Sequence, residues 1–323
     1  MQRDFGQMSF GDGLINQRKG RNEWLDDLDK LIDWSPVKQI LKPIYASDVG
    51  KPSYPHLTMF KLLLLGRWYD LSDEGIEEAV DDRLSFRRFA RLPLDRAAPD
   101  HSTIWRFRDQ ITRLALHEAL FEEVNRQLDA HGLILRKGTL IDATIVRAAV
   151  KPPRKEEGQV TARDPDAGFT KKHGKSTFGY KGHIGVDQDT DLIRKTAFTS
   201  ADVHDSVPAD SLISGDEEAA YGDKAYDSRE RRERLQGAGI EPRLMYKAAR
   251  NRPLKSWQEW FNKAVSPIRS GVERPFGHMK GRYGYTRVRF RGLARNHCDF
   301  NLLALAMNLR RGLVLYKRQA TCA

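Results

Sequence analysis

The sequence predicts a mixed α/β layer fold preceded by an all-helical N-terminal part. In the first 132 residues, apolar side chains recur at helical spacing, whereas short apolar strands alternate with helices from residue 138 onward. Charge divides the chain at nearly the same place, because residues 1–138 carry 21 Lys or Arg against 22 Asp or Glu, and residues 139–323 carry 34 against 22. We therefore expect two domains, residues 1–132 and 133–323.

The first part has the signatures of several short helices. Ser72 is a favourable N-cap, and Asp73 and Glu74 follow it in a first turn that suits the helix dipole. Gly132 is expected to end the last helix of the set. Helical periodicity or a start signal also marks residues 24–32, 57–68, 86–89, 99–108 and 114–131.

Residues 101–108 combine basic and aromatic side chains. A basic, aromatic helix late in a set of short helices is typical of a helix-turn-helix unit, in which Arg106 and Arg108 would contact DNA. The alternative is a helical bundle in which Trp105 and Phe107 are core residues. The alternation Trp-Arg-Phe-Arg does not separate apolar from basic residues on a helix, so both interpretations remain open.

From residue 138 the pattern changes to strands. Residues 138–146 are apolar and β-branched except for Asp142, and residues 178–187 and 192–199 predict a hairpin. The other expected elements are, in order, a long basic loop at 151–175, a helix at 205–214, a strand at 219–226, a helix at 228–237 and a strand at 242–246. This order predicts a mixed sheet with flanking helices.

The excess positive charge lies in the second part of the chain. The net charge is +11 at pH 7 and the pI is about 9.6. Positive charge concentrated in one domain favours a polyanion as partner, most simply nucleic acid. The alternative is a solvated basic surface that only aids solubility.

Other features of the composition concern the compartment. Cys298 and Cys322 have no metal-ligand spacing and indicate a reducing environment. No apolar run approaches the roughly 20 residues that a membrane span needs. The first 18 residues contain no apolar core of signal-peptide length. We therefore expect a cytoplasmic protein without a membrane partner.

Three carboxylates occupy positions where a negative charge is unexpected from the surrounding sequence. Asp142 interrupts an apolar strand, where an unpaired charge would be costly to bury. Asp223 ends another strand, the place where α/β sheets carry functional side chains. Glu273 is the only acidic residue between residues 263 and 295, a stretch with nine Lys or Arg. Each residue alone also has a structural explanation. Asp142 could be a paired structural Asp, Asp223 an Asp in a turn, and Glu273 a salt-bridge partner.

Taken together, the three carboxylates form an oxygen-only ligand set, which Mg²⁺ and Mn²⁺ prefer. In phosphoryl transfer, a pair of such ions activates the attacking oxygen and stabilises the leaving oxygen. We expect Asp142 to bridge the two ions, with Asp223 and Glu273 beside it. The three side chains are therefore predicted to converge in space, although they are 81 and 50 residues apart.

Arg269 and Lys280 fall on nearly the same helix face as Glu273. We expect them to hold DNA phosphates near the ions, and the alternative is an exposed face that only aids solubility. Pro275 favours a kink or a restart of the helix near Glu273. An adjacent apolar stripe would pack the helix on a sheet and consists of Ile268, Val272, Phe276, Met279 and Tyr283.

These residues resemble a known signature. Arg269, Glu273 and Lys280 match the Arg-(3)-Glu-(6)-Lys part of the signature of bacterial DDE transposases, although Ser266 stands where the broader signature has Tyr. The resemblance runs over about residues 50–310. Blocks similar to the insertion-sequence-five family of these enzymes occur in order at residues 140–144, 178–183, 222–226, 273–276 and 284–293.

The resemblance implies an RNase H-like catalytic core in which Asp142, Asp223 and Glu273 bind Mg²⁺ and act as the catalytic residues. It also implies cut-and-join chemistry on double-stranded DNA at the ends of a mobile element. The protein would lie in the bacterial cytoplasm and on the nucleoid when bound to DNA. Two ends must be joined, which predicts a homodimer or a higher homo-oligomer. Arg287 and Arg289, in the last block, are expected to add DNA contacts.

Two other functions fit the same residues. A two-metal nuclease of the same fold would cleave DNA without joining it, since hydrolysis and strand transfer differ only in the attacking oxygen. A non-catalytic DNA-binding relative is the other alternative, and the intact set of three carboxylates argues against it. The absence of a Gly-rich phosphate loop and of a dinucleotide fingerprint argues against ATP-driven or nicotinamide-dependent chemistry.

Overall fold

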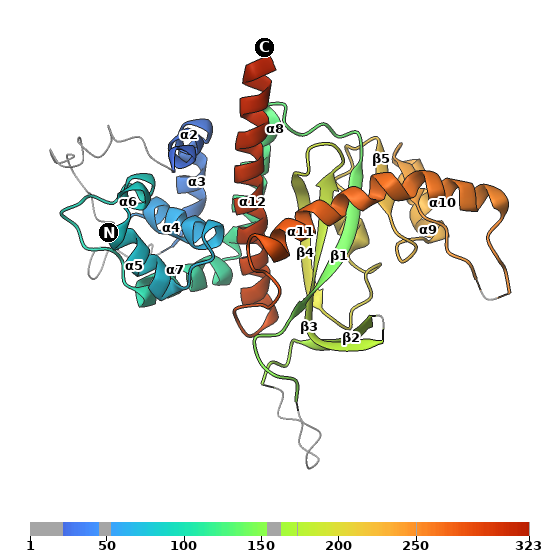
Figure 1. The fold of residues 1–323 in the computed structure, drawn as a ribbon, viewed down its shortest axis with the longest axis horizontal. Coiled ribbons are helices and arrows are strands. Elements are labelled where there is room, and N and C mark those ends of the chain that lie inside the picture. Colours follow the sequence, from blue (N-terminus) through green and yellow to red (C-terminus); the bar gives the residue numbers. More distant parts are fainter. Residues whose placement is uncertain (1–21, 45–52, 154–162, 173, 250, 323) are drawn as a thin grey trace. The chain divides into compact units, whose positions relative to one another are not determined.

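Contacts divide the chain into two compact units (Figure 1). The helical unit comprises Met1–His131 with Asn301–Ala323, and the mixed unit comprises Gly132–Phe300. The final residues of the chain thus pack with the first helices rather than with the sheet. The computed structural model describes residues 22–44, 53–153, 163–172, 174–249 and 251–322.

The helical unit begins with short helices that carry the predicted start signals. The Ser72 side chain accepts a hydrogen bond from the Gly75 N–H, and Asp100 accepts one from the Thr103 N–H. The helices are α2 (Glu23–Leu31), α3 (Trp34–Leu41), α4 (His56–Trp68), α5 (Asp73–Asp82), α6 (Leu84–Ala90), α7 (His101–Arg113) and α8 (Leu116–Ala130). The prediction that this part of the chain is helical is confirmed.

Lys61 is the only charged side chain of the helical unit with no exposed surface among the described residues, and it lies on α4, whose residues are all buried. It forms an ion pair with Asp29. The ammonium also lies over the rings of Trp34 and Phe89, 4.7 and 4.6 Å from their centroids. The carboxylate and the two aromatic faces together compensate the hydration that the buried cation has lost.

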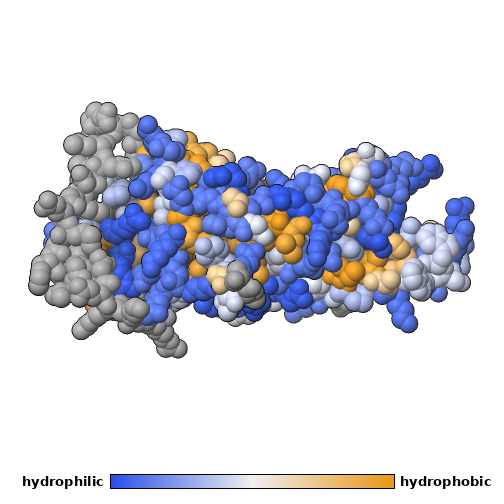
Figure 2. All heavy atoms as spheres, turned by 90° about the horizontal axis from the view of Figure 1, so that it is seen from above, coloured by the Kyte–Doolittle hydropathy of each residue, from blue (hydrophilic) through white to orange (hydrophobic). Residues whose placement is uncertain are grey.

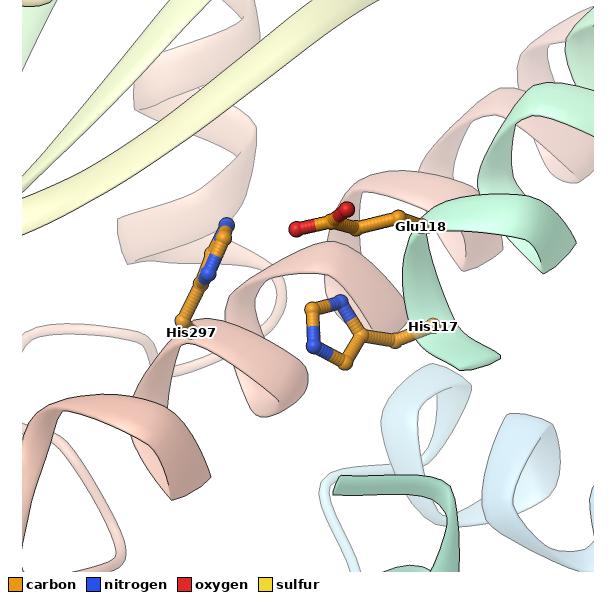
Figure 3. Close-up of side chains that lie close together, drawn as sticks. All are labelled: His117, Glu118 and His297. Carbon is orange, nitrogen blue, oxygen red and sulfur yellow. The ribbon is translucent and has the colours of Figure 1, made fainter. Parts of the chain in front are cut away.

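The long C-terminal helix α12 (Leu293–Cys322) supplies most of its length to the helical unit. Trp68 Nε1 donates a 2.7 Å hydrogen bond to the Ala306 carbonyl. His117 lies in the first turn of α8 (Figure 3), and its Nδ1 is 2.9 Å from the amide nitrogen of Asn301. These buried polar contacts explain why the end of the chain packs with the first helices.

Within the part of the chain that the structure describes, six strands form one mixed sheet in the order β2–β3–β1–β5–β6, with β4 also paired to β3 (Figure 1). β3 is antiparallel to its neighbours, whereas β1, β5 and β6 run parallel. The strands are β1 (Thr139–Arg147), β2 (Gly168–Lys172), β3 (Lys175–Asp187), β4 (Ile193–Ser200), β5 (Ala219–Gly222) and β6 (Glu241–Leu244). The predicted hairpin is that of β3 and β4, and it is confirmed.

The two faces of the sheet are covered by different elements. Ile141 packs with the 3-10 turn η1 and with α9 on one face, and Leu140 approaches Gly271 on the other. Because side chains alternate along a strand, Asp142 lies on the same face as Leu140. The covering elements of the first face are η1 (Ala209–Leu212) and α9 (Arg229–Gly237).

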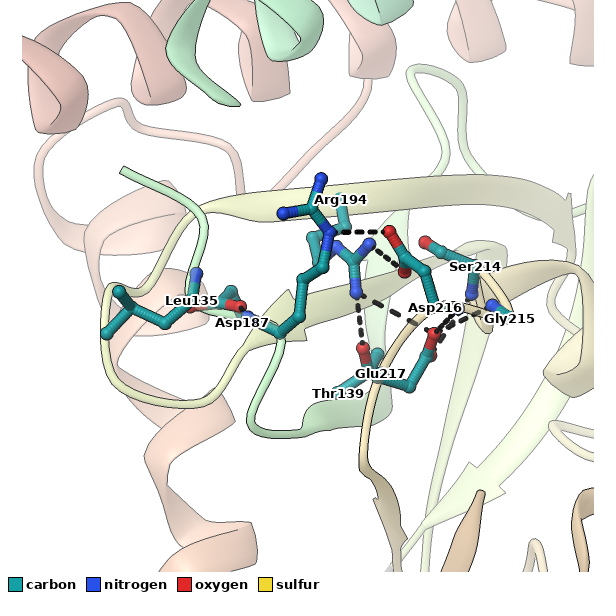
Figure 4. Close-up of polar contacts among 9 residues, drawn as sticks. Leu135, Thr139, Asp187, Arg194, Ser214, Gly215, Asp216 and Glu217 are labelled. Atoms are coloured by element: carbon teal, nitrogen blue, oxygen red, sulfur yellow. Dashed lines mark hydrogen bonds and ion pairs between the residues drawn. The ribbon is translucent and has the colours of Figure 1, made fainter. Parts of the chain in front are cut away.

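A buried polar network holds the beginning of β1 against the segment that leads into β5 (Figure 4). Glu217, just before β5, accepts hydrogen bonds from three successive backbone N–H groups at residues 214–216. Arg194, from β4, lies 3.7 Å from Glu217 and 3.3 Å from the hydroxyl of Thr139, which begins β1. These contacts maintain one register of β1 and β5, because a shift of either strand would leave buried charges without partners.

The expected helix at residues 205–214 is wrong. Only the four residues of η1 are helical in this segment. Asp205 forms an ion pair with Lys181 at 2.8 Å, and Pro208 has no N–H to donate within a helix. The tertiary ion pair and the proline therefore outweigh the helical pattern.

The expected loop at residues 151–175 contains a strand. β3 begins at Lys175 rather than at Phe178, and β2 pairs with this extension to form a second hairpin. The strand β2 has the sequence Gly-Phe-Thr-Lys-Lys, which is short and carries little apolar surface, so pattern alone does not reveal it. Residues 154–162 and 173 of the expected loop lie outside the described part of the chain.

The helical segment around Glu273 consists of three pieces. α10 (Ser256–Arg269) is followed by the 3-10 turn η2 (Ser270–Val272) and by α11 (Glu273–Gly281). The restart that Pro275 favours is confirmed, because Pro275 lies in the first turn of α11, where a backbone N–H has no helical partner. Glu273 is thereby the first residue of a helix.

One face of the molecule is mainly polar. In the space-filling view, hydrophilic side chains cover most of the visible face, and hydrophobic ones form separate small patches (Figure 2). Among the described residues, no helix is long and apolar enough to cross a membrane.

The environment of Lys61 generates a test of the helical core. Lys61→Ala opens a cavity between the Trp34 and Phe89 rings, so the free energy of unfolding is expected to fall by about 2–5 kcal/mol. Lys61→Met keeps most of the side-chain volume and removes the buried charge, so the change is expected to stay below about 1.5 kcal/mol. Asp29 keeps a second partner, Arg91, in both variants. Urea unfolding followed by circular dichroism measures the two changes, and a Met variant as unstable as the Ala variant would show that the charge carries the contribution.

Candidate active site

Asp142 and Asp223 lie side by side on neighbouring strands. In the parallel pairing of β1 and β5, Leu140 lies opposite Tyr221, an offset of 81 residues. The same offset separates Asp142 from Asp223, the first residue after β5. Adjacent strands are about 4.8 Å apart, so this register brings the two carboxylates together.

The backbone orients each of these aspartates. Asp142 Oδ1 accepts a 2.8 Å hydrogen bond from the Ala143 N–H, and Asp223 Oδ1 accepts one of 2.8 Å from the Ala225 N–H. The second contact is an Asx turn, which ends β5 after Gly222. Both side chains are half-buried, and their orientation depends on the chain immediately after each residue.

Arg269 connects Glu273 to this pair. Its guanidinium donates a 2.5 Å hydrogen bond to Asp142 Oδ2 and lies 3.7 Å from Glu273 Oε1. Arg269 ends α10 and Glu273 begins α11, so the η2 turn sets the spacing between them. Asp142 therefore lies next to Asp223, and Arg269 lies between Asp142 and Glu273.

The three carboxylates are gathered, but they do not surround a single point. Within the described part of the chain, their ligand oxygens do not all lie within 4.8 Å of one another, and the Arg269 guanidinium lies next to Asp142. Burial raises the pKa of Asp142 from 3.8 to about 6; Arg269 and Lys172 oppose this rise and Asp223 adds to it. A half-buried carboxylate whose ionisation is disfavoured gains much from a bound cation.

The donor set fits a hard divalent cation. All three side chains offer oxygen, the ligand type that Mg²⁺ and Mn²⁺ prefer. Tyr226 gives a second indication: it is buried, and its hydroxyl has no hydrogen-bond partner among the described residues. Burial raises the pKa of Tyr226 well above its usual range, and the charges of Asp142 and Asp223 add to this effect. Tyr226 packs in the core with Ile141, and an unpaired buried hydroxyl within electrostatic reach of carboxylates is typical of a site that another group completes.

The segments that carry or adjoin these carboxylates also carry cations. Lys280 is on α11, and the protein around its ammonium lowers its pKa, with a further contribution from the charge of Lys172. Arg287 forms a β-bridge with Arg147, the last residue of β1. Arg289 is half-buried two residues further along. The sequence pattern missed Lys172 because β2 was expected to be part of a loop.

In the helical unit, the two arginines that were expected to contact DNA differ in exposure. Arg106 is exposed on α7 beside Trp105, which is 42% exposed, whereas Phe107 is buried. Arg108 is buried, and both terminal nitrogens of its guanidinium contact the Asp73 carboxylate at the start of α5. Arg108 thus has a structural role in place of the expected DNA contact, because the protein itself uses its donors.

His183 lies on β3 opposite Ala143, the residue after Asp142. It is fully buried; its Nε2 is 2.8 Å from the Thr199 hydroxyl, and its Nδ1 has no partner in the described chain. Burial lowers the pKa of His183 to about 4, and the opposing effect of the Asp205 charge is smaller. The imidazole is therefore neutral at pH 7.

Comparison with protein families gives two matches. A family described as the transposase DDE domain matches residues 135–309, and a family described as a transposase domain (DUF772) matches residues 14–110. The first match contains all six strands and the three carboxylates, and the second contains α2 to α6 and most of α7. With the observed layers, these matches confirm the predicted fold class, an RNase H-like core preceded by an all-helical part.

The buried His183 predicts how stability depends on pH. Its pKa is about 4 in the folded protein against an ordinary value of 6.5, so between these values the unfolded chain binds a proton that the folded chain does not. Stability is therefore expected to fall as the pH drops from 6.5 toward 4, by about 1.4 kcal/mol for each unit of pKa difference.

Urea unfolding at a series of pH values tests this expectation. His183→Asn is the matched variant, because it keeps a neutral polar group next to Thr199 and cannot take up the proton. The wild type is expected to lose stability relative to this variant between pH 6.5 and 4. A constant difference across that range would contradict the burial of a neutral imidazole.

Proposed function

Because the chain belongs to the DDE transposase family, we propose that it cleaves DNA at the ends of an insertion sequence and joins those ends to a target DNA. A DDE-type transposase acts on DNA, and enzymes of this family use divalent metal ions. Within the family, the blocks at residues 140–144, 222–226 and 284–293 support the insertion-sequence-five group. We propose Mg²⁺ as the ion, with Mn²⁺ as an alternative.

The connection of three carboxylates from separate segments, by strand register and by Arg269, is the observation that supports this proposal. Asp142 and Asp223 are separated in sequence by the same number of residues as the paired residues of β1 and β5, so they lie on neighbouring strands. Arg269 contacts both Asp142 and Glu273. An oxygen-only set of this kind suits phosphoryl transfer, in which the protein supplies position and charge compensation rather than a nucleophile of its own.

Bound divalent ions would activate the attacking oxygen and stabilise the leaving oxygen of an in-line displacement at phosphorus. The protein orients the ligands beforehand, since the Ala143 and Ala225 N–H groups hold the two aspartates in place. In cleavage, water attacks the phosphorus and a 3′-hydroxyl leaves. In joining, that 3′-hydroxyl attacks a phosphodiester of the target and displaces another 3′ oxygen, so the same residues serve both steps.

Arg269 has a different task in the free protein and on DNA. Its guanidinium contacts Asp142 Oδ2 at 2.5 Å, a position that a metal ion and the guanidinium cannot share. A DNA phosphate offers the guanidinium an alternative partner of the kind that it binds best. We therefore expect DNA and metal ions to bind cooperatively, each increasing the affinity for the other.

Recognition of the element ends is assigned to the helical unit. Arg106 and Trp105 are exposed on α7, whereas Ile104, Phe107 and Ile111 of the same helix are buried. Lys280, Arg287 and Arg289 are assigned to DNA phosphates in the mixed unit. Two ends require two active sites, so the working complex is proposed to be a homodimer or a higher homo-oligomer on DNA.

Substitution of the carboxylates tests the proposed chemistry. Asp142→Asn, Asp223→Asn and Glu273→Gln are each expected to reduce Mg²⁺-dependent strand cleavage to background, because each removes a negative ligand. DNA binding in EDTA is expected to remain, since Lys and Arg carry most of it. The exposed carboxylate of Glu259 on α10 provides the control, and Glu259→Gln should retain cleavage.

The product of the same reaction separates the alternatives. Incubation with DNA that carries candidate end repeats, followed by sequencing of joined molecules, detects strand transfer. Cleavage without joined products would identify a nuclease, and metal-independent binding without nicking would identify a non-catalytic protein.

The Arg269 contact predicts a specific change in metal binding. Without DNA, Arg269→Gln is expected to bind Mn²⁺ about five-fold or more tightly than the wild type, because the competing cation at Asp142 is gone. The same variant should lose most of the increase in Mn²⁺ affinity that DNA causes in the wild type. Isothermal titration calorimetry, with and without DNA, measures both effects.

Arg274→Gln is the matched control for this experiment. It removes the same charge one residue after Glu273, but Arg274 pairs with Asp191, at 2.7 Å, rather than with the site. If both variants change Mn²⁺ affinity equally, net charge rather than the Arg269 contact is responsible.

A further inference from the structure

The hairpin of β2 and β3 extends past the end of the central strand. Gly179 lies opposite Arg147, the last residue of β1, and also opposite Gly168 of β2. Residues 175–178 continue beyond this point and pair with β2. Residues 168–172 and 175–179 therefore form an arm that leaves the sheet where β1 ends.

The base of this arm is fixed by two carboxylates. Asp164 is buried and accepts hydrogen bonds from the Tyr180 hydroxyl at 2.7 Å and from the Gly292 N–H at 3.1 Å. Asp166 accepts one of 2.7 Å from the Leu293 N–H, which begins α12. The start of α12 thereby determines where the two strands leave the sheet.

The tip of the arm carries uncompensated positive charge. Lys172 and Lys175 lie directly opposite each other across the two strands, so their side chains are on one face. Both are exposed, and neither forms an ion pair within the described chain. Like charges in this position destabilise a hairpin unless an anion lies between them.

A third lysine, Lys280, lies on α11. The segment that follows α11 forms a β-bridge between Arg287 and Arg147, the residue at which the arm begins. Lys280 and Glu273 lie on the same face of α11, because seven residues make nearly two helical turns. Burial lowers the pKa of Lys280, and the charge of Lys172 adds to this effect, so the arm tip lies within electrostatic reach of α11. α11 thus presents an ammonium group on the face that carries Glu273, and the arm tip carries two more.

We propose that Lys172 and Lys175 of the arm and Lys280 of α11 form a phosphate-binding site that holds one DNA strand beside the three carboxylates. The identification of the anion as DNA rests on the proposed function. A phosphodiester backbone suits the site, because it presents a negative charge at every step and lysine binds it as a point charge without reading sequence. The arm would position the strand, and the carboxylates would act on it.

Binding of a DNA duplex of fixed length, measured by fluorescence anisotropy in EDTA over a range of salt concentrations, tests the site. Lys172→Ala is expected to weaken binding several-fold and to reduce the slope of log K against log salt by about one. Lys171→Ala is the matched control, since it removes the same charge from the neighbouring residue, whose side chain is on the other face of the arm. This control is expected to keep the wild-type slope.

The double variant Lys172→Ala, Lys280→Ala tests whether the two lysines bind the same strand. Their effects are expected to differ from the product of the single effects, because neighbouring contacts to one strand depend on each other. An unchanged salt slope in Lys172→Ala, or equal effects of Lys171→Ala and Lys172→Ala, would overturn the proposal. Circular dichroism establishes that each variant is folded.

The phosphate-binding site and the proposed function can be refuted separately. If Lys172→Ala reduces the salt slope but the wild type never cleaves DNA, the phosphate site is supported and the proposed transposase function is wrong. If the wild type cleaves and joins DNA but Lys172→Ala leaves the salt slope unchanged, the proposed function is supported and the phosphate site is wrong.

Discussion

The common register of β1 and β5 is the constraint on which the candidate active site depends. A shift of one residue would move Asp142 to the opposite face of the sheet, because side chains alternate along a strand. The register is held at the start of the strands by the buried contacts of Glu217 and Arg194 with the backbone and with Thr139. A polar network with no chemical task thus keeps Asp142 and Asp223 together.

Gathering carboxylates is unfavourable in a half-buried place, and the protein compensates for it with cations of its own. Arg269 contacts Asp142 directly and approaches Glu273, while burial still raises the pKa of Asp142 to about 6. The site therefore combines a disfavoured negative charge with a guanidinium that has another natural partner in DNA. These are the properties expected of a site that is completed only when substrate and metal ions are present together.

Both units neutralise cations in ion pairs, and the mixed unit has positive charge in excess. In the helical unit, Arg88 and Arg108 form ion pairs with Asp26 and Asp73, so these positive charges are neutralised within the fold. In the mixed unit, Arg194 and Arg231 form ion pairs with Asp216 and Asp210, and the arm and α11 also present lysines on the surface. The excess of positive charge in the second part of the sequence is therefore the feature that favours a polyanion.

The sequence by itself determined the features that depend on neighbouring residues: the N-caps Ser72 and Asp100, the apolar strand around Asp142, the restart of the helix at Glu273, and the residue types of the three carboxylates. Only the tertiary structure decided what depends on distant partners. Arg108 turns inward because it meets a carboxylate 35 residues away, and the contact between Arg269 and Asp142 joins residues 127 apart. The strand β2 exists because β3 offers it an edge, and its own sequence carries too little apolar surface to indicate a strand. Periodicity and capping are local, whereas ion pairs and strand pairing are properties of the folded chain.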